Sequence, residues 1–116
     1  MRRAFRTGFA GFWATALIAG LASAQSTEPV KLTIKDHRFT PTEVSAPAGE
    51  RFRIEVANQD PTPAEFESSE LKVEKVVAAG SKITVMAGPL KPGAYKFFDD
   101  YHPDTATGTL NAVQGK

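Results

Sequence analysis

Apolar and polar residues alternate along much of the chain after its first 29 positions. In segments 30–35 and 51–56, an apolar side chain occupies every second position. A period of two is that of a strand with one buried face and one face toward solvent. The same alternation returns at Ile83 and Val85, and again at Tyr95 and Phe97. The pattern predicts an all-β chain.

Turn-forming residues separate these segments, and they keep each predicted strand short. Glycine, proline, asparagine and aspartate gather at 47–49, 58–61, 79–80 and 91–93, and these residue types favour turns. Pro61 and Pro63 lack a backbone donor, so the loop that contains them should lie outside any sheet. A short helical turn is predicted within 68–77. Short strands at this spacing favour a single-domain, two-sheet Greek-key sandwich.

The first 24 residues have the pattern of an export signal rather than of a folded segment. Arg2, Arg3 and Arg6 precede an apolar run at 9–21, and a small-x-small tripeptide ends the segment at 22–24. The apolar run has 13 residues, fewer than the roughly 20 needed to span a bilayer. We therefore expect residues 1–24 to be a cleaved signal peptide and residues 25–116 to be the exported, periplasmic domain. A retained membrane anchor is the alternative.

The charge and composition of the remaining domain exclude several functions. Without residues 1–24 the chain has 11 basic and 13 acidic residues, a net charge of −2. No basic stripe remains, so nucleic acid is not an expected partner. The chain has no cysteine, so stability must come from the core rather than from disulfides. No serine is paired with a histidine in a recognisable nucleophile motif, which argues against a hydrolytic enzyme.

The chain has two histidines, and they differ in surroundings. His37 lies just before Pro41 in a polar stretch, where an exposed turn histidine is the expected role. His102 has three aspartates, Asp99, Asp100 and Asp104, within three residues of it. Imidazole and carboxylate groups are both ligands for divalent metals. His102 is therefore the candidate metal ligand, with a solvated acidic loop as the alternative.

The segment 88–97, Gly-Pro-Leu-Lys-Pro-Gly-Ala-Tyr-Lys-Phe, resembles the cupredoxin signature. In that family a Pro-Gly turn leads into a strand Tyr-x-Phe-x-Cys, and a histidine and often a methionine follow. In this chain Asp99 occupies the cysteine position, His102 the histidine position and Thr107 the methionine position. The family's other histidine falls at Ala64, within Pro-Ala-Glu-Phe-Glu. The resemblance implies a cupredoxin-like Greek-key β-sandwich without the blue-copper cysteine.

A blue-copper centre needs a thiolate and two imidazoles, so simple blue-copper electron transfer is excluded. Pro-Ala-Glu-Phe-Glu and Phe-Phe-Asp-Asp-Tyr-His-Pro-Asp are similar to motifs of cupredoxin-like periplasmic proteins of bacterial ferrous and elemental iron uptake. That resemblance implies handling of Fe(II) or Fe(III), with copper assisting oxidation, before a membrane permease takes the ion. Carboxylates with one imidazole favour iron, manganese or Cu(II) over Cu(I). The expected metal ligands are Asp99 and His102, completed by Glu65 or Glu67.

Strand geometry places a condition on this ligand set. If 64–68 is a strand with Phe66 in the core, Glu65 and Glu67 both face away from the core. They reach a shared ion with Asp99 only if the strand twists or bulges. By the same alternation Asp100 points away from Asp99 and is expected to support the ligands. A solvated strand face is the alternative for the glutamates.

The resulting hypothesis is a periplasmic metal-binding accessory protein of an iron uptake system, binding iron or non-blue copper. It delivers the ion to a periplasmic or membrane iron-transport component, and any enzymatic activity is limited to ferroxidase-like assistance. The alternative is a metal-free β-sandwich interaction module of the same system. Stoichiometric metal in the purified protein separates the two.

Overall fold

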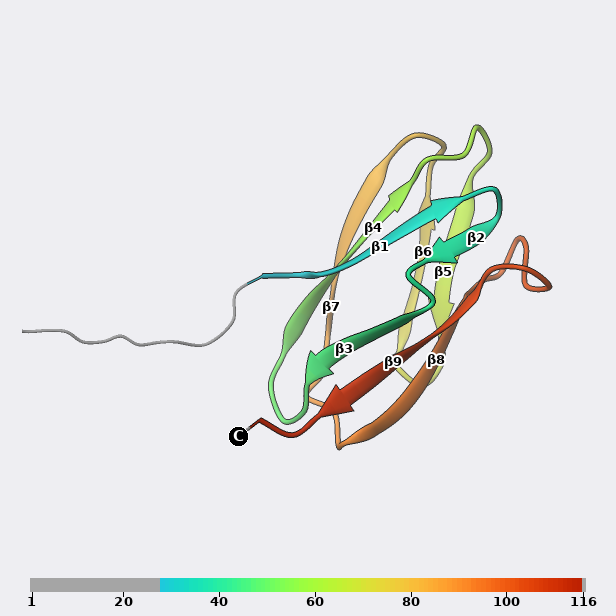
Figure 1. Ribbon diagram of the computed structural model, residues 1–116. Coiled ribbons are helices and arrows are strands. Elements are labelled where there is room, and N and C mark those ends of the chain that lie inside the picture. Colours follow the sequence, from blue (N-terminus) through green and yellow to red (C-terminus); the bar gives the residue numbers. More distant parts are fainter. Residues whose placement is uncertain (1–27, 116) are drawn as a thin grey trace, which may run out of the picture.

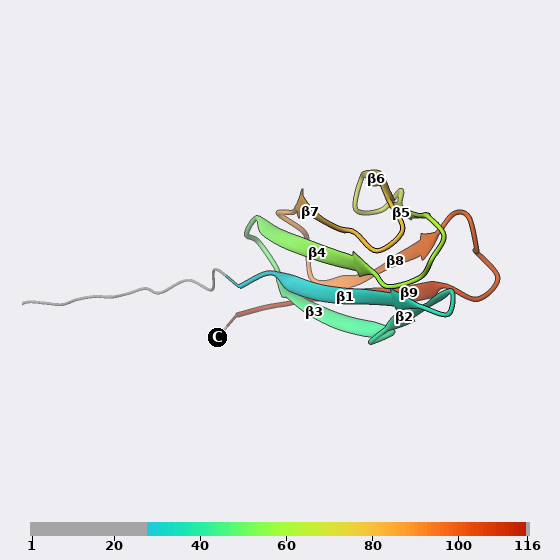
Figure 2. The ribbon, with the colours of Figure 1, turned by 90° about the horizontal axis from the view of Figure 1, so that it is seen from above.

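The computed structural model describes residues 28–115, which form nine strands in two packed sheets (Figures 1 and 2). The expected signal peptide, residues 1–24, lies outside the described residues. Within the described part of the chain, no helix has the length and hydropathy to cross a membrane. The fold is an all-β sandwich, as the alternating pattern predicts.

The first sheet has four strands, in the order β2-β1-β4-β7. β1 runs parallel to β4, whereas β2 and β7 pair antiparallel with their neighbours. The bounds are β1 (Val30–Lys35), β2 (Arg38–Thr40), β4 (Phe52–Asn58) and β7 (Lys82–Ala87).

The second sheet has five strands, in the order β3-β9-β8-β5-β6. β3 runs parallel to β9, and the other neighbouring pairs are antiparallel. The bounds are β3 (Glu43–Pro47), β5 (Ala64–Ser68), β6 (Val73–Val77), β8 (Gly93–Asp99) and β9 (Thr107–Val113).

The core lies between the sheets and is built from the alternate residues of each strand. In β4, for example, Ile54 and Val56 are fully buried while Arg53 is exposed. Three phenylalanines bridge the sheets, with ring centroids 4.9 Å apart for Phe39 and Phe97 and 5.5 Å apart for Phe66 and Phe97. Full burial of such a side chain contributes about 1.5–3 kcal/mol. Phe66 of this cluster pairs with Asp99 across β5 and β8, which connects the core to the residues at the end of β8.

The predicted helical turn within 68–77 is wrong. A turn at 69–72 leads directly into β6, which pairs antiparallel with β5 along its whole length. The Ser68 hydroxyl donates to the carbonyl oxygen of Lys96 (2.6 Å) and accepts the N–H of Leu71 (3.0 Å). Because Ser68 closes the turn and fixes it to β8, the chain reverses without a helix.

Three connections meet at one end of the sandwich: the β1–β2 turn, the β4–β5 loop and the β8–β9 loop (Figure 1). Asp60 of the β4–β5 loop accepts the backbone N–H groups of Asp36 (2.6 Å) and His37 (2.9 Å). The Thr105 hydroxyl of the β8–β9 loop donates to the carbonyl oxygen of His37 (2.7 Å). The buried side chain of Asn58 accepts the N–H of Asp60 (3.0 Å), which fixes the start of the β4–β5 loop. These bonds tie the three connections into one surface.

Candidate functional site

Asp99, the last residue of β8, is fully buried and faces the interior. Its Oδ1 accepts the backbone N–H of Glu65 (2.8 Å) and of Tyr101 (3.0 Å). Its Oδ2 lies 2.9 Å from Nδ1 of His102. One carboxylate therefore joins β5, the end of β8 and the β8–β9 loop. Both oxygens of Asp99 are used by protein donors, so the side chain positions its neighbours.

His102 lies in the first turn of the β8–β9 loop, and its side chain is 29% exposed. Its backbone N–H donates to the carbonyl oxygen of Asp99 (2.9 Å), and its own carbonyl accepts the N–H of Ala106 (3.0 Å). The imidazole stacks on that of His37, with ring centroids 3.7 Å apart and planes 19° apart. The structure thus brings together two histidines that lie 65 positions apart in the sequence.

His37 is in the β1–β2 turn, as expected, but it is not a solitary exposed side chain. Its ring is 43% exposed, and Nδ1 lies 3.5 Å from Oδ2 of the buried Asp60. Burial acts to raise the pKa of Asp60. The backbone N–H groups of His37 and Asp36, with the nearby charges of His37 and Lys35, outweigh burial and lower that pKa below its ordinary value. Asp60 is therefore an ionised anchor for this turn.

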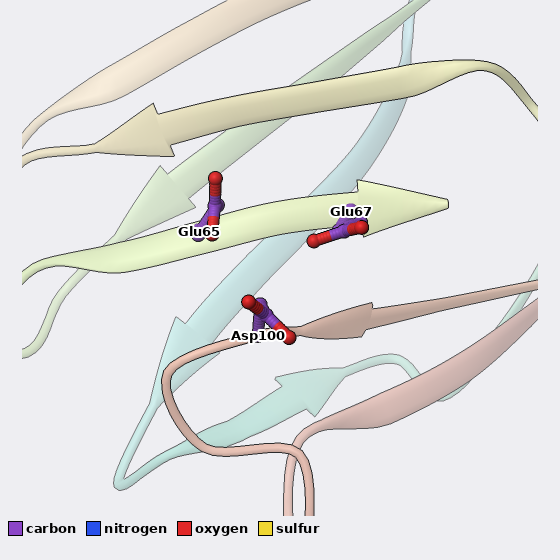
Figure 3. Close-up of side chains that lie close together, drawn as sticks. All are labelled: Glu65, Glu67 and Asp100. Carbon is purple, nitrogen blue, oxygen red and sulfur yellow. The ribbon is translucent and has the colours of Figure 1, made fainter. Parts of the chain in front are cut away.

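A second group of side chains lies on the opposite, outer face of the same sheet. Glu65 and Glu67 of β5 and Asp100, just after β8, each place a carboxylate oxygen within 4.8 Å of the others (Figure 3). Successive strand residues point to opposite faces, so inward-facing Phe66 and Asp99 leave Glu65, Glu67 and Asp100 facing outward. The backbone N–H of Asp100 donates to the carbonyl oxygen of Glu65 (2.9 Å), which fixes the two elements relative to each other.

The carboxylates of this outer group disfavour one another's ionisation. Partial burial raises the pKa of Glu65, and a hydrogen bond shared with Glu74 and the charges of Glu74, Glu67 and Asp100 raise it further. Partial burial also raises the pKa of Glu67, with added repulsion from Asp100 and Glu74. A bound cation would reverse this repulsion.

The four predicted ligands do not form one shell. Asp99 and His102 are in contact, but Glu65 and Glu67 project from the other face of the sheet. The reason is the register of the sheet, which pairs Phe66 with Asp99 and therefore turns the glutamates away. Asp100, expected to play only a supporting part, joins the glutamates instead.

His37 is the residue of this region that the sequence pattern did not single out. The sequence feature that could have pointed to His37 is its place in a tight turn. Two residues, Asp36 and His37, separate β1 from β2. A two-residue hairpin of this kind usually carries Asn-Gly or Asp-Gly. A histidine at the second position is a departure that points to a role for the side chain.

Comparison with known proteins identifies the family. The sequence model of the cupredoxin-like domain family matches residues 8–112. The chain belongs to the cupredoxin-like domain family. A Rickettsia prowazekii (strain Madrid E) relative, the uncharacterized protein RP394, is 47% identical over 81 residues. That match covers 70% of this chain but 65% of the relative, less than two thirds of its length.

Solved structures similar to this cupredoxin-like domain include amicyanin from Paracoccus versutus, with a TM-score of 0.59 and 16% identity. That similarity covers 77% of this chain and 85% of amicyanin. A purple cupredoxin from Nitrosopumilus maritimus has a TM-score of 0.56 and 15% identity, over 72% of this chain and 98% of that one. At these identities the similarities establish the fold alone.

The residues of this cupredoxin-like domain do not fit a blue-copper ion. The chain contains no cysteine, and Asp99 has the place predicted for the thiolate. Both oxygens of Asp99 accept hydrogen bonds from Glu65, Tyr101 and His102. Since a blue site needs a copper–thiolate bond, this chain cannot form one.

Proposed function

We propose that this cupredoxin-like protein binds a hard or borderline metal ion, with iron as its cargo, through Glu65, Glu67 and Asp100. The observation that carries the proposal is the approach of three carboxylate oxygens, from β5 and from the residue after β8, to within 4.8 Å of one another. Oxygen ligands of this kind suit iron and manganese ions. Asp99 and His102 then hold the loop that carries Asp100, rather than binding the same ion.

The electrostatics of the outer group support a cation as its partner. The raised pKa values of Glu65 and Glu67 mean that folding places negative charges together at a cost. A di- or trivalent ion offsets that cost, because opposite charge favours the ionised form of each carboxylate. The backbone bond between Asp100 and Glu65 presets the spacing before an ion arrives.

The cellular role that we propose is an exported accessory protein of an iron uptake system. Its support is the similarity of the segments at 63–67 and 97–104 to iron-uptake cupredoxin-like proteins, together with the export pattern of residues 1–24. Reversible binding by three carboxylates suits delivery to a membrane or periplasmic transport component. Non-blue Cu(II) is a second ion that this donor set accommodates.

A metal-free interaction module of the same system is the competing function. One observation favours it: Tyr101, 48% exposed, directly follows the acidic group. Tyrosine is enriched at protein interfaces relative to the rest of the surface. In that case the acidic group would contact a basic surface instead of an ion.

Anaerobic calorimetric titration of the untagged protein with Fe(II), and separately with Mn(II), tests the proposal. We expect one ion per chain, with binding lost in the double variant Glu65→Gln/Glu67→Gln, because two of three ligands lose their charge. Glu50→Gln is the matched control, since Glu50 is an exposed residue between β3 and β4. Absence of binding by the parent protein would favour the interaction module, and unchanged binding by the double variant would show that the ion binds elsewhere.

A further inference from the structure

The stacked histidines have a shared feature that the carboxylate site does not use. Each imidazole directs Nδ1 at a buried carboxylate: His102 at Asp99 (2.9 Å) and His37 at Asp60 (3.5 Å). The two aspartates are 0% and 5% exposed, whereas the rings are 29% and 43% exposed. Two histidines from separate loops thus lie side by side. The Nδ1 side of each ring faces a buried aspartate, and the remainder of each ring is partly exposed.

The two carboxylates favour one arrangement of the ring nitrogens. Asp99 already accepts two backbone N–H groups, and Asp60 accepts two others. An ionised carboxylate only accepts hydrogen bonds, so Nδ1 of His102 is placed to donate to Asp99 at 2.9 Å. Nδ1 of His37 faces Asp60 at the longer distance of 3.5 Å. In a neutral ring with the proton on Nδ1, Nε2 carries the free lone pair. Metal-binding histidines show this arrangement, donating the other ring N–H to a carboxylate.

The backbone of the β1–β2 turn is held in a conformation that most residues avoid. Asp36 and His37 have φ values of 53° and 57°, in the left-handed region where glycine is favoured at the second position of such a hairpin. Asp60 stabilises this turn by accepting both N–H groups. Non-glycine residues kept in this region cost about 1–3 kcal/mol each and gather at functional sites. The turn places the His37 ring against His102.

We propose that His37 and His102 form a second metal site, which binds a borderline transition-metal ion such as Cu(II) through the two Nε2 atoms. Asp60 and Asp99 are positioning residues that orient the rings. This site is separate from the outer carboxylate group and does not depend on it. Imidazole suits copper, nickel and zinc, and among divalent ions of this series Cu(II) binds most tightly.

The two rings are close enough to share one ion, but they must reorient to do so. Their centroids are 3.7 Å apart and their planes 19° apart, and each nitrogen would bind the ion at about 2.0–2.1 Å. Nearly parallel rings must turn for both lone pairs to meet at the ion. His37 has the longer contact with its aspartate, 3.5 Å against 2.9 Å, so His37 is the ring that turns.

Pulsed EPR of Cu(II) added below one equivalent to the untagged protein tests the proposal. The remote nitrogen of a bound imidazole gives modulations that a terminal amine lacks, and the chain has two histidines. We expect the signature of two imidazoles in the parent and of one in His37→Ala and in His102→Ala. Each substitution should weaken Cu(II) binding by about tenfold or more, since loss of an orienting partner alone costs about 10–100-fold.

Two further measurements keep the proposal falsifiable. In the unsubstituted protein, traces of Cu(II) should broaden the NMR signals of the His37 and His102 rings before those of Glu65 and Glu67. Glu65→Gln/Glu67→Gln should leave the two-imidazole signal unchanged, whereas it abolishes Fe(II) binding if the carboxylate proposal holds. A parent spectrum with one imidazole or none, or broadening that begins at the glutamates, overturns the histidine site and leaves the carboxylate proposal standing.

Discussion

At the scale of single residues, the buried aspartates organise this end of the molecule. Asp99 and Asp60 are 0% and 5% exposed, and between them they accept four backbone N–H groups. A buried carboxylate is tolerated only when such donors surround it. In the sequence Asp99 aligns with a ligand position, and in the structure both of its oxygens contact groups of the protein. The alignment pointed to this residue, whereas its partners follow from the packing of β5 against β8.

The outer glutamates have raised pKa values, unlike Asp60, and this leads to a prediction about how stability depends on pH. Glu67 has a raised pKa in the folded protein because of burial and the charges of Asp100 and Glu74. Its ionised form is therefore less favourable in the folded state than in the unfolded state. The ordinary pKa of a glutamate is 4.5, and the pKa of Glu67 in the folded protein is higher. The metal-free parent should therefore lose stability as the pH rises from 4.5 through the pKa of Glu67 in the folded protein. Below the ordinary value this penalty is absent.

Glu67→Gln should accordingly melt at a higher temperature than the parent at pH 7 in a chelator. The difference should vanish near pH 4, where both proteins are uncharged at this position. Thermal unfolding followed by circular dichroism at the two pH values measures this. If the substitution lowers the melting temperature at pH 7, the carboxylate group is not a site of repulsion.

At the scale of strands, the alternation of apolar residues predicted β1, β4, β7 and β8 and the face on which each residue of β5 lies. It did not predict β6, because three successive residues of that short edge strand are exposed and the period is lost. It also could not pair His37 with His102, because their contact depends on how two loops pack. The alternation of apolar residues reports on each strand separately. Which residues meet at the site depends instead on the register between strands and on the packing of loops.

Gly108 of β9 shows how closely β8 and β9 pack against each other. It lies opposite Phe97 in the ladder, and a Cβ there would overlap the Phe97 ring and lie 2.9 Å from the carbonyl oxygen of Thr42. Gly108→Ala should therefore destabilise the protein by about 1–3 kcal/mol, the usual cost of overpacking. Urea unfolding measures the change. Gly115→Ala, where a Cβ meets nothing within 4 Å, is the control, and equal stability of the two variants would contradict this packing argument.

At the scale of the whole molecule, the sandwich holds two kinds of donor in two places. Three carboxylates lie on the outer face of the five-stranded sheet, and two imidazoles lie on loops at one end of the sandwich. The backbone N–H of Glu65 binds Asp99 on the inner side, while its side chain joins Glu67 and Asp100 on the outer side. A cupredoxin-like domain without cysteine thus separates oxygen donors from imidazole donors. The sequence motifs supplied nearly all of these donors. The register of β5 and β8 turns Glu65 and Glu67 away from Asp99, which contacts His102.

This separation predicts two independently occupied sites. Native mass spectrometry of the protein with Mn(II) and Cu(II) supplied together should show one ion of each per chain, because carboxylates suit Mn(II) and imidazoles suit Cu(II). The variant Glu65→Gln/Glu67→Gln should retain copper alone, and His37→Ala/His102→Ala should retain manganese alone. If either double variant loses both ions, the glutamates and histidines bind one common ion. The carboxyl end of β8 must then rearrange on metal binding, since the observed register turns Glu65 and Glu67 away from Asp99 and its partner His102.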